Sequence, residues 1–150
     1  MAYAKNRNAK IKKIHHIGIA VKDFDASVKN WEKTFGLIPD KTEDYPEWGV
    51  KLAFYKIGEL WFILVEGKKP VGILDPSTKT GAYLKNLGEG FFHMAFLIDD
   101  IHTMVKEMNE NKVSLFDTSV KSEGYEGSLY AFVDPAETNN ALVHLYDAKW

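Results

Sequence analysis

Two histidines, His16 and His93, occupy matching places in two similar stretches of the chain. Residues 14–21 read IHHIGIAV and residues 91–98 read FFHMAFLI, and an aspartate and a helical pattern follow each run. Imidazole nitrogens bind metals and transfer protons near neutral pH. A histidine kept in register across an internal repeat therefore predicts two halves of one fold, each of which supplies a ligand to a shared site.

Composition limits the classes of function. The hydrophobic fraction of 45% and the charged fraction of 27% are those of an ordinary soluble globular protein with room for one packed domain. The formal net charge of -2 argues against general affinity for nucleic acid, and the absence of cysteine excludes disulfides and thiolate metal sites. The apolar runs are too short to cross a bilayer and no signal-peptide pattern opens the chain, so we expect a cytoplasmic protein without a membrane partner.

The chain is expected to contain two modules with the same element order, β-α-β-β-β. Residues 1–11 form a flexible basic tail, and residues 12–66 form the first module. Its first strand covers residues 12–21, and Asp25 is expected to cap a helix that runs to about Phe35 and stops at Gly36. Its other strands are expected near residues 37–43, 50–57 and 60–66.

Residues 67–90 are predicted to be a linker with a short helix near residues 81–86, because glycines and prolines interrupt the pattern. Residues 91–150 form the second module, with Asp100 as a helix cap. Its strands are expected at residues 91–98, 113–120, 127–133 and 140–147. The fold class is therefore α+β, with eight strands in one curved mixed sheet around a cavity and the helices outside.

Alternation along the strands predicts which residues face the cavity. Ile17, Ile19 and Val21 are expected to pack under the first helix, which directs His16 to the opposite face. His93 faces away from the second helix for the same reason, and His15 has the opposite orientation and a structural role. The aromatic residues Trp61, Tyr130 and Phe132 fall on the cavity side, where they form a wall for an apolar substrate or part of the core.

The motifs resemble the vicinal oxygen chelate superfamily, which includes glyoxalase I, extradiol dioxygenases, antibiotic-resistance binding proteins and methylmalonyl-CoA epimerase. His16-Ile17-Gly18-Ile19-Ala20-Val21-Lys22-Asp23 is similar to the opening of these proteins. Pro46-Glu47-Trp48-Gly49 and the segment of residues 83–96 are most similar to the epimerases. The resemblance covers nearly all of the chain after the basic tail.

The resemblance implies four metal-ligand positions, one on the first and one on the last strand of each module. In this chain they fall on His16, Ile63, His93 and His144. The family usually has Glu or Gln where Ile63 stands, and Glu where His144 stands. Because Ile63 has no donor atom, the implied site consists of His16, His93 and His144, which suits Zn²⁺, Co²⁺, Ni²⁺ or Fe²⁺.

Three functions remain open on the sequence. The first is a metal-dependent epimerase or lyase that moves a proton next to a carbonyl or thioester, with Glu47 as the base by resemblance or else as a surface turn residue. The second is a metal-free binding protein for an apolar compound, which the isoleucine at position 63 favours. The third is a three-histidine iron oxygenase. The substrate is expected to be a small molecule, such as an acyl-CoA, in contact with Trp61, Ile63, Tyr130 and Phe132, and the resemblance implies a homodimer.

Overall fold

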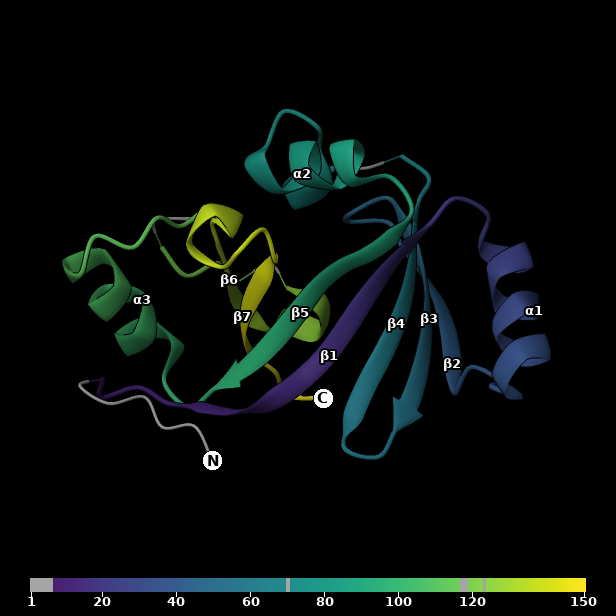
Figure 1. Cartoon of the computed structure of the whole chain (residues 1–150), viewed down its shortest axis with the longest axis horizontal. Coiled ribbons are helices and arrows are strands. Elements are labelled where there is room, and N and C mark those ends of the chain that lie inside the picture. The colour runs from purple at the N-terminus through teal and green to yellow at the C-terminus, as the bar shows by residue number, and fades with distance from the viewer. Residues whose placement is uncertain (1–6, 70, 117–118, 123) are drawn as a thin grey trace. The chain divides into compact units, whose positions relative to one another are not determined.

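A computed structural model describes residues 7–69, 71–116, 119–122 and 124–150. The chain divides into two compact units. The first unit is His16–Phe92, and the second unit combines the segment that ends at His15 with His93–Trp150. Within the described ranges there are three α-helices and seven strands, which Figure 1 labels in chain order. No helix in these ranges is both long and apolar enough to span a bilayer.

The first unit contains most of β1 (Ile11–Val21) and continues through α1 (Phe24–Phe35), β2 (Lys41–Tyr45), β3 (Val50–Ile57), β4 (Leu60–Gly67) and α2 (Lys79–Leu87). The strand order within this unit is β2-β3-β4-β1. Strands β2, β3 and β4 are successive antiparallel neighbours, and β4 runs parallel to β1. The parallel pair is possible because the chain passes through α1, β2 and β3 before β4 returns beside β1.

Helix α1 covers one face of this sheet because its apolar residues recur at helical spacing. Val28 and Trp31 pack against a buried cluster that includes Ala53, Tyr55 and Leu64. Ile19 and Val21 of β1 join the same cluster, as strand alternation predicts.

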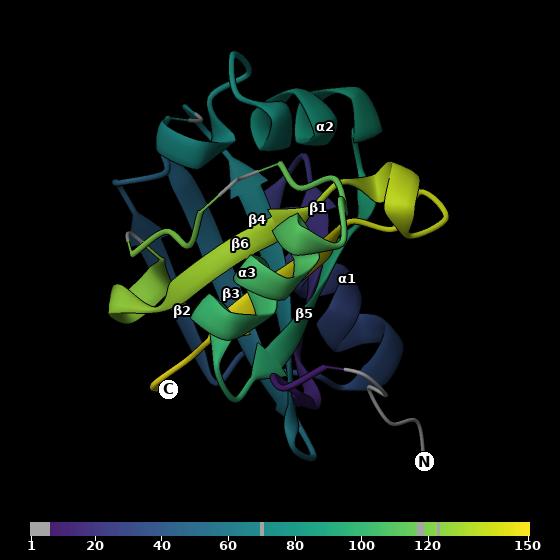
Figure 2. The same ribbon diagram turned by 90° about the vertical axis from the view of Figure 1, so that its left-hand side faces the viewer.

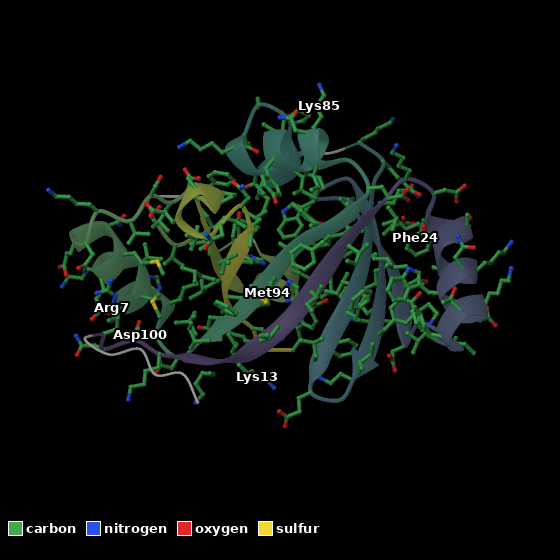
Figure 3. The ribbon with its side chains drawn as sticks, viewed as in Figure 1. Arg7, Lys13, Phe24, Lys85, Met94 and Asp100 are labelled. Carbon is green, nitrogen blue, oxygen red and sulfur yellow. The ribbon has the colours of Figure 1, made fainter. Side chains whose placement is uncertain are left out.

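The caps of α1 are partly as expected. Gly36 ends the helix in a left-handed conformation, with φ of 70°. The N-cap is Asp23 rather than Asp25, since the Asp23 carboxylate accepts the Ala26 amide at 3.0 Å. Phe24, labelled in Figure 3, is therefore already helical.

The second unit contains most of β5 (Gly90–Ile98), followed by α3 (Ile101–Glu110), β6 (Leu129–Val133) and β7 (Val143–Asp147). The strand order is β5-β7-β6, with β5 parallel to β7 and β7 antiparallel to β6. Helix α3 packs against β6 and β7, and Figure 2 shows the helix in front of β6. Asp100, labelled in Figure 3, caps α3 by accepting the Thr103 amide at 3.0 Å. The core under α3 contains Met104, Val105, Ala131, Val133, Val143 and Leu145.

The expectation of eight strands is wrong for the described residues, because residues 113–116 and 119–120 do not form a strand. Leu115 makes an isolated bridge to Val133, while residues 117 and 118 of the expected strand lie outside the described ranges. The Ser114 amide donates to the carboxylate of Glu137 instead of to a neighbouring strand. The segment is joined to β6 by single backbone hydrogen bonds, such as the one from the Phe116 amide to the Phe132 carbonyl oxygen, and not by a continuous ladder.

The strands predicted at residues 127–133 and 140–147 begin later than expected. Tyr125–Gly127 forms a 3₁₀ turn in which Glu126 has φ of 55°, so β6 begins at Leu129. Asn139 and Asn140 also have positive φ, and β7 begins only at Val143. Extended pairing requires negative φ, so these left-handed residues shorten both strands. The α+β class and the mixed strand pairing are confirmed.

Candidate metal centre

His93 and His144 lie together in the second unit. His93 is on β5 and His144 is on β7, and both are buried. Their ring centroids are 5.3 Å apart, with the ring planes 77° from parallel. One nitrogen of each ring lies within 4.8 Å of the other. Two nitrogens on one ion lie no more than about 4.2 Å apart, since each Zn–N bond is about 2.0–2.1 Å long, so this pair is near the spacing of a shared ion.

Strand alternation explains why both histidines turn away from α3. Val143 and Leu145 on β7 belong to the core under the helix, so His144 between them projects from the opposite face. Ala95 is the register partner of His144 in the parallel pair of β5 and β7. His93 lies two residues before Ala95 and therefore shares its face.

Aromatic rings enclose His144. Phe132 lies directly opposite it on β6 and stacks on the imidazole, with centroids 4.2 Å apart and planes within 4° of parallel. Tyr146 and Tyr130 follow at 4.8 Å and 5.7 Å. Tyr130 and Phe132 are both buried, and they share the face of His144 because they pair with Tyr146 and His144 in the register of β6 and β7.

Burial sets the charge state of the pair. Loss of hydration lowers the pKa of His93 to about 3. Burial also lowers the pKa of His144 well below its ordinary value, with further contributions from nearby His93 and His15. Both rings are therefore neutral at pH 7, which is the protonation state that binds metal. The two residues fit a transition-metal centre in chemistry and in spacing.

His16 belongs to the first unit, where its surroundings match those of His93. It is buried on β1, and its register partner in the parallel pair is Trp61 of β4. Two residues further on, Gly18 pairs with Ile63, just as Ala95 pairs with His144 in the second unit. The same register therefore places Ile63 in the first unit where His144 stands in the second.

Ile63 and Trp61 share the face of the sheet that carries His16. Ile63 is 7% exposed and offers no ligand atom at the position equivalent to His144. Trp61 packs edge to face against Phe54 at 6.2 Å, and the Lys56 ammonium lies 4.8 Å from its ring centroid. The first unit thus contributes one imidazole and an apolar surface.

Glu47 lies in the turn between β2 and β3, and its side chain is exposed. The turn is fixed at Gly49, whose carbonyl accepts the amides of Lys68 and Lys69. Gly49 has φ of 62°, and a Cβ there would lie 1.8 Å from the Lys69 carbonyl oxygen, so only glycine fits. A rigid turn therefore presents the Glu47 carboxylate at the end of the sheet where Val50 pairs with Gly67.

A polar network of Trp150, Tyr146 and Ser128, which the sequence did not reveal, lies next to His144. The indole Nε1 of Trp150 donates to Tyr146 Oη at 2.9 Å and to Ser128 Oγ at 3.2 Å. His15 is buried, and its Nε2 lies 3.0 Å from the Trp150 carbonyl oxygen. His15 thus has the structural surroundings expected of it. Since His15 and Trp150 are 135 residues apart and form no motif, no local pattern predicts this contact.

The comparisons with known proteins establish the class. Residues 15–132 match the glyoxalase/bleomycin resistance protein/dioxygenase superfamily. This match covers more than half of the chain, which therefore belongs to that superfamily.

The chain is similar along most of its length to two individual proteins. The chain is 29% identical over 137 residues to YqjC of Bacillus subtilis, an uncharacterized protein, covering 91% of this chain and 93% of the relative. It is 26% identical over 139 residues to the ethylmalonyl-CoA/methylmalonyl-CoA epimerase of Cereibacter sphaeroides, covering 90% of this chain and 97% of the epimerase.

A solved structure agrees with these relatives. The methylmalonyl-CoA epimerase of Streptomyces coelicolor, as an E43L variant in complex with 2-nitronate-propionyl-CoA, is similar with a TM-score of 0.74 and 28% sequence identity. The match covers 93% of this chain and 96% of the epimerase chain. The fold is therefore shared with a methylmalonyl-CoA epimerase.

Proposed function

We propose that the protein is a metal-dependent epimerase that moves a proton at the carbon next to the thioester of an acyl-CoA. One observation carries the proposal: His93 and His144 are buried, neutral and close enough to bind one ion. The epimerase relatives support the acyl-CoA substrate class. A glyoxalase-type lyase would use the same proton transfer on a different carbonyl substrate.

His16, His93 and His144 would hold the metal. The matching strand registers support this assignment, because His16 stands in the first unit where His93 stands in the second. When bound, the ion supplies a Lewis acid that polarises the thioester carbonyl. Three histidines leave coordination positions for substrate oxygens, and suit Zn²⁺, Co²⁺, Ni²⁺ or Fe²⁺.

Glu47 would take the proton from one face of the α-carbon, and inversion would require a proton donor on the opposite face. A carboxylate in a fixed turn meets the first requirement of a general base, which is a defined position. The apolar side chains of Trp61, Ile63, Tyr130 and Phe132 would contact the acyl group and exclude water, which strengthens the interaction between carboxylate and substrate. No second carboxylate is assigned, because His144 stands where the family usually has Glu.

The competing function is metal-free binding of an apolar compound, which Ile63 favours because it removes one ligand. Exchange of the α-proton of methylmalonyl-CoA in D₂O separates the two. We expect metal-dependent exchange in the wild type and a loss of about 10²–10⁴-fold in Glu47→Gln, which is the range for removal of a general base. Glu59→Gln, an exposed glutamate in the next turn, is the matched control.

Exchange that is independent of added metal, or equal in Glu47→Gln and Glu59→Gln, would refute the proposed mechanism. A wild type that shows no exchange with any metal, while an apolar ligand raises its melting temperature, would favour the binding protein. The family resemblance also predicts a homodimer, which sedimentation velocity tests, and the short apolar runs predict a cytoplasmic location.

A further inference from the structure

A pocket of about 230 Å³ lies in the second unit, under helix α3. Its walls are mostly apolar side chains of α3, of the segment after it and of β6 and β7, among them Met104, Met108, Val113, Val133, Val143 and Leu145. A cavity of about 150 Å³ lined by leucine, isoleucine and phenylalanine stays dry and binds benzene in another protein. The pocket under α3 therefore has the volume and the apolar surface to hold an aromatic ring with a second fused ring.

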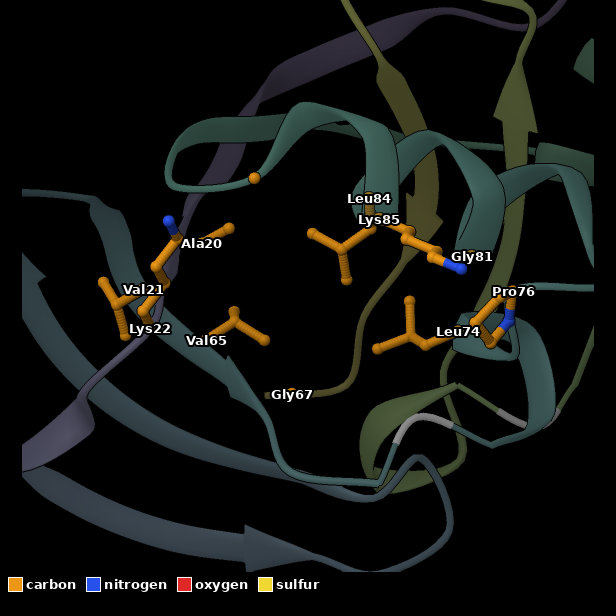
Figure 4. A pocket seen from close by; sticks show the side chains of 11 residues that line it. Ala20, Val21, Lys22, Val65, Gly67, Leu74, Pro76, Gly81, Leu84 and Lys85 are labelled. Carbon is orange, nitrogen blue, oxygen red and sulfur yellow. The ribbon is translucent and has the colours of Figure 1, made fainter.

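The pocket under α3 lies on the face of β7 that is opposite to the candidate metal centre. Val143 and Leu145 line the pocket, while His144 between them projects from the other face of the strand. The pocket that Figure 4 shows differs in this respect, because it lies in the first unit and its wall residue Ala20 shares the face of His16. The pocket under α3 is therefore separate from the residues that carry the proposed function.

Two polar residues of the loop between β6 and β7, Glu137 and Thr138, lie at this pocket. The Glu137 carboxylate accepts the Ser114 amide at 2.8 Å, and the Thr138 hydroxyl donates to the Ala141 carbonyl oxygen at 2.6 Å. Because the hydroxyl proton of Thr138 is already donated, the oxygen can only accept a hydrogen bond from a ligand. Both side chains therefore offer acceptors, and the same hydrogen bonds order them before a ligand binds, which lowers the entropic cost of binding.

The charges at the pocket favour an uncharged ligand. Among the described residues that line it there is no lysine, arginine or histidine, so an anionic ligand would meet the Glu137 carboxylate without a compensating cation. A cationic ligand would have to leave water for apolar walls, which costs free energy. Since Glu137 is exposed, its attraction for such a cation is weak and does not offset that cost.

The types of side chain in the wall favour an aromatic ring over an alkyl chain. Met104 and Met108 lie one turn apart on α3, and methionine sulfur packs favourably against aromatic rings while its flexible chain adapts to their shape. Phe96 of β5 also lines the pocket and offers an edge or a face to a second ring. We infer that the pocket under α3 is a second ligand site, which takes a compact, uncharged aromatic compound with one hydrogen-bond donor. This site needs neither the metal nor the acyl-CoA of the proposed function.

The test uses indole as the probe and measures its Kd by calorimetry. Val113→Trp places an indole ring of the protein itself at the pocket, and Val120→Trp is the matched control, because Val120 packs half-buried against the same core and does not line the pocket. We expect the Kd for indole to rise at least tenfold in Val113→Trp and to stay at the wild-type value in Val120→Trp. Indene, which has the shape of indole without the N–H donor, should bind about two- to tenfold more weakly than indole, the range for one hydrogen bond.

The charge preference is tested with indole-5-carboxylate, which is anionic at pH 7. It should bind the wild type at least tenfold more weakly than indole. Glu137→Gln should reduce this difference, because the amide can still accept the Ser114 amide but has no charge. Glu110→Gln, which changes an exposed glutamate of α3 that does not line the pocket, should leave the difference unchanged.

A measurement on the wild type locates the probe and does not depend on how the variants fold. With methyl-labelled methionine, nuclear Overhauser effects should connect the indole ring protons to the methyl groups of Met104 and Met108. No such effect to either methyl group, or equal Kd values in Val113→Trp and Val120→Trp, would overturn the inference. Binding of indene or indole-5-carboxylate that is as tight as that of indole would overturn the ligand class. None of these readouts involves α-proton exchange, so failure of the proposed function leaves them unaffected.

Discussion

Replacement of Ile63 by glutamine should give the site a fourth ligand. Ile63 occupies in the first unit the register position that His144 occupies in the second, and it is 7% exposed. Without metal, the variant loses about 1.5–3 kcal/mol of apolar burial. A buried amide without a partner costs a further 1–3 kcal/mol or so. The metal-free variant should therefore be about 2.5–6 kcal/mol less stable than the wild type.

Metal should restore part of this loss. If the amide oxygen tightens metal binding about tenfold, saturating metal stabilises Ile63→Gln by about 1.4 kcal/mol more than it stabilises the wild type. Urea unfolding with chelator, and again with excess Zn²⁺ or Co²⁺, measures both quantities. Val65→Gln is the matched control, because Val65 lies on the same strand and face and is 6% exposed. It should lose similar stability and gain nothing extra from metal.

One result would refute this reasoning. If metal stabilises Ile63→Gln no more than it stabilises Val65→Gln, position 63 does not face the metal. Ile63 would then not stand at a ligand position, although its strand register matches that of His144.

Three further predictions concern stability and the Glu47 turn. The pKa of His93 is about 3 in the folded protein, so between about pH 6.5 and pH 3 the unfolded chain binds a proton at His93 and the folded protein does not. The free energy of unfolding therefore decreases as the pH is lowered through this range. At pH 5 the loss from this residue is about 2 kcal/mol in chelator, and His93→Gln should remove it while exposed His102→Gln should not. Leu145→Ala, at a core position that is 1% exposed, should cost about 2–5 kcal/mol by calorimetry, and a cost below 1 kcal/mol or so would contradict the packing under α3. Gly49→Ala should lower both stability and proton exchange, whereas Gly58→Ala, with φ of 60° but open space around it, should cost about 1 kcal/mol and leave exchange intact.

The periodic parts of the fold were predictable from the sequence. Alternation assigned Ile19 and Val21 to the side of α1, because a strand that is covered by a helix must carry apolar residues at every second position. Gly36 marked a helix end, because glycine adopts the left-handed conformation without strain. These features depend on neighbours in sequence, which a local pattern contains.

Features that depend on distant partners were not predictable. In place of the expected strand at residues 113–120, Leu115 makes an isolated bridge to β6 while the Ser114 amide donates to the carboxylate of the distant Glu137, and Asp23 rather than Asp25 caps α1. In the candidate site, the repeat indicated His93 and the resemblance indicated His144. Phe132 stacks on His144 because β6 pairs with β7, and the Trp150 indole donates to Tyr146 because the C-terminal residues fold back onto β7. Alternation along one strand contains neither contact.

Metal content is the most direct test of the central claim, that buried neutral histidines form a metal centre. The protein is purified without chelator, incubated with Zn²⁺, Co²⁺ or Fe²⁺, and analysed for bound metal beside His93→Ala and the exposed-residue control His102→Ala. The account predicts about one equivalent in the wild type and in His102→Ala, and little in His93→Ala. Little metal in all three proteins, or equal metal in all three, would contradict it.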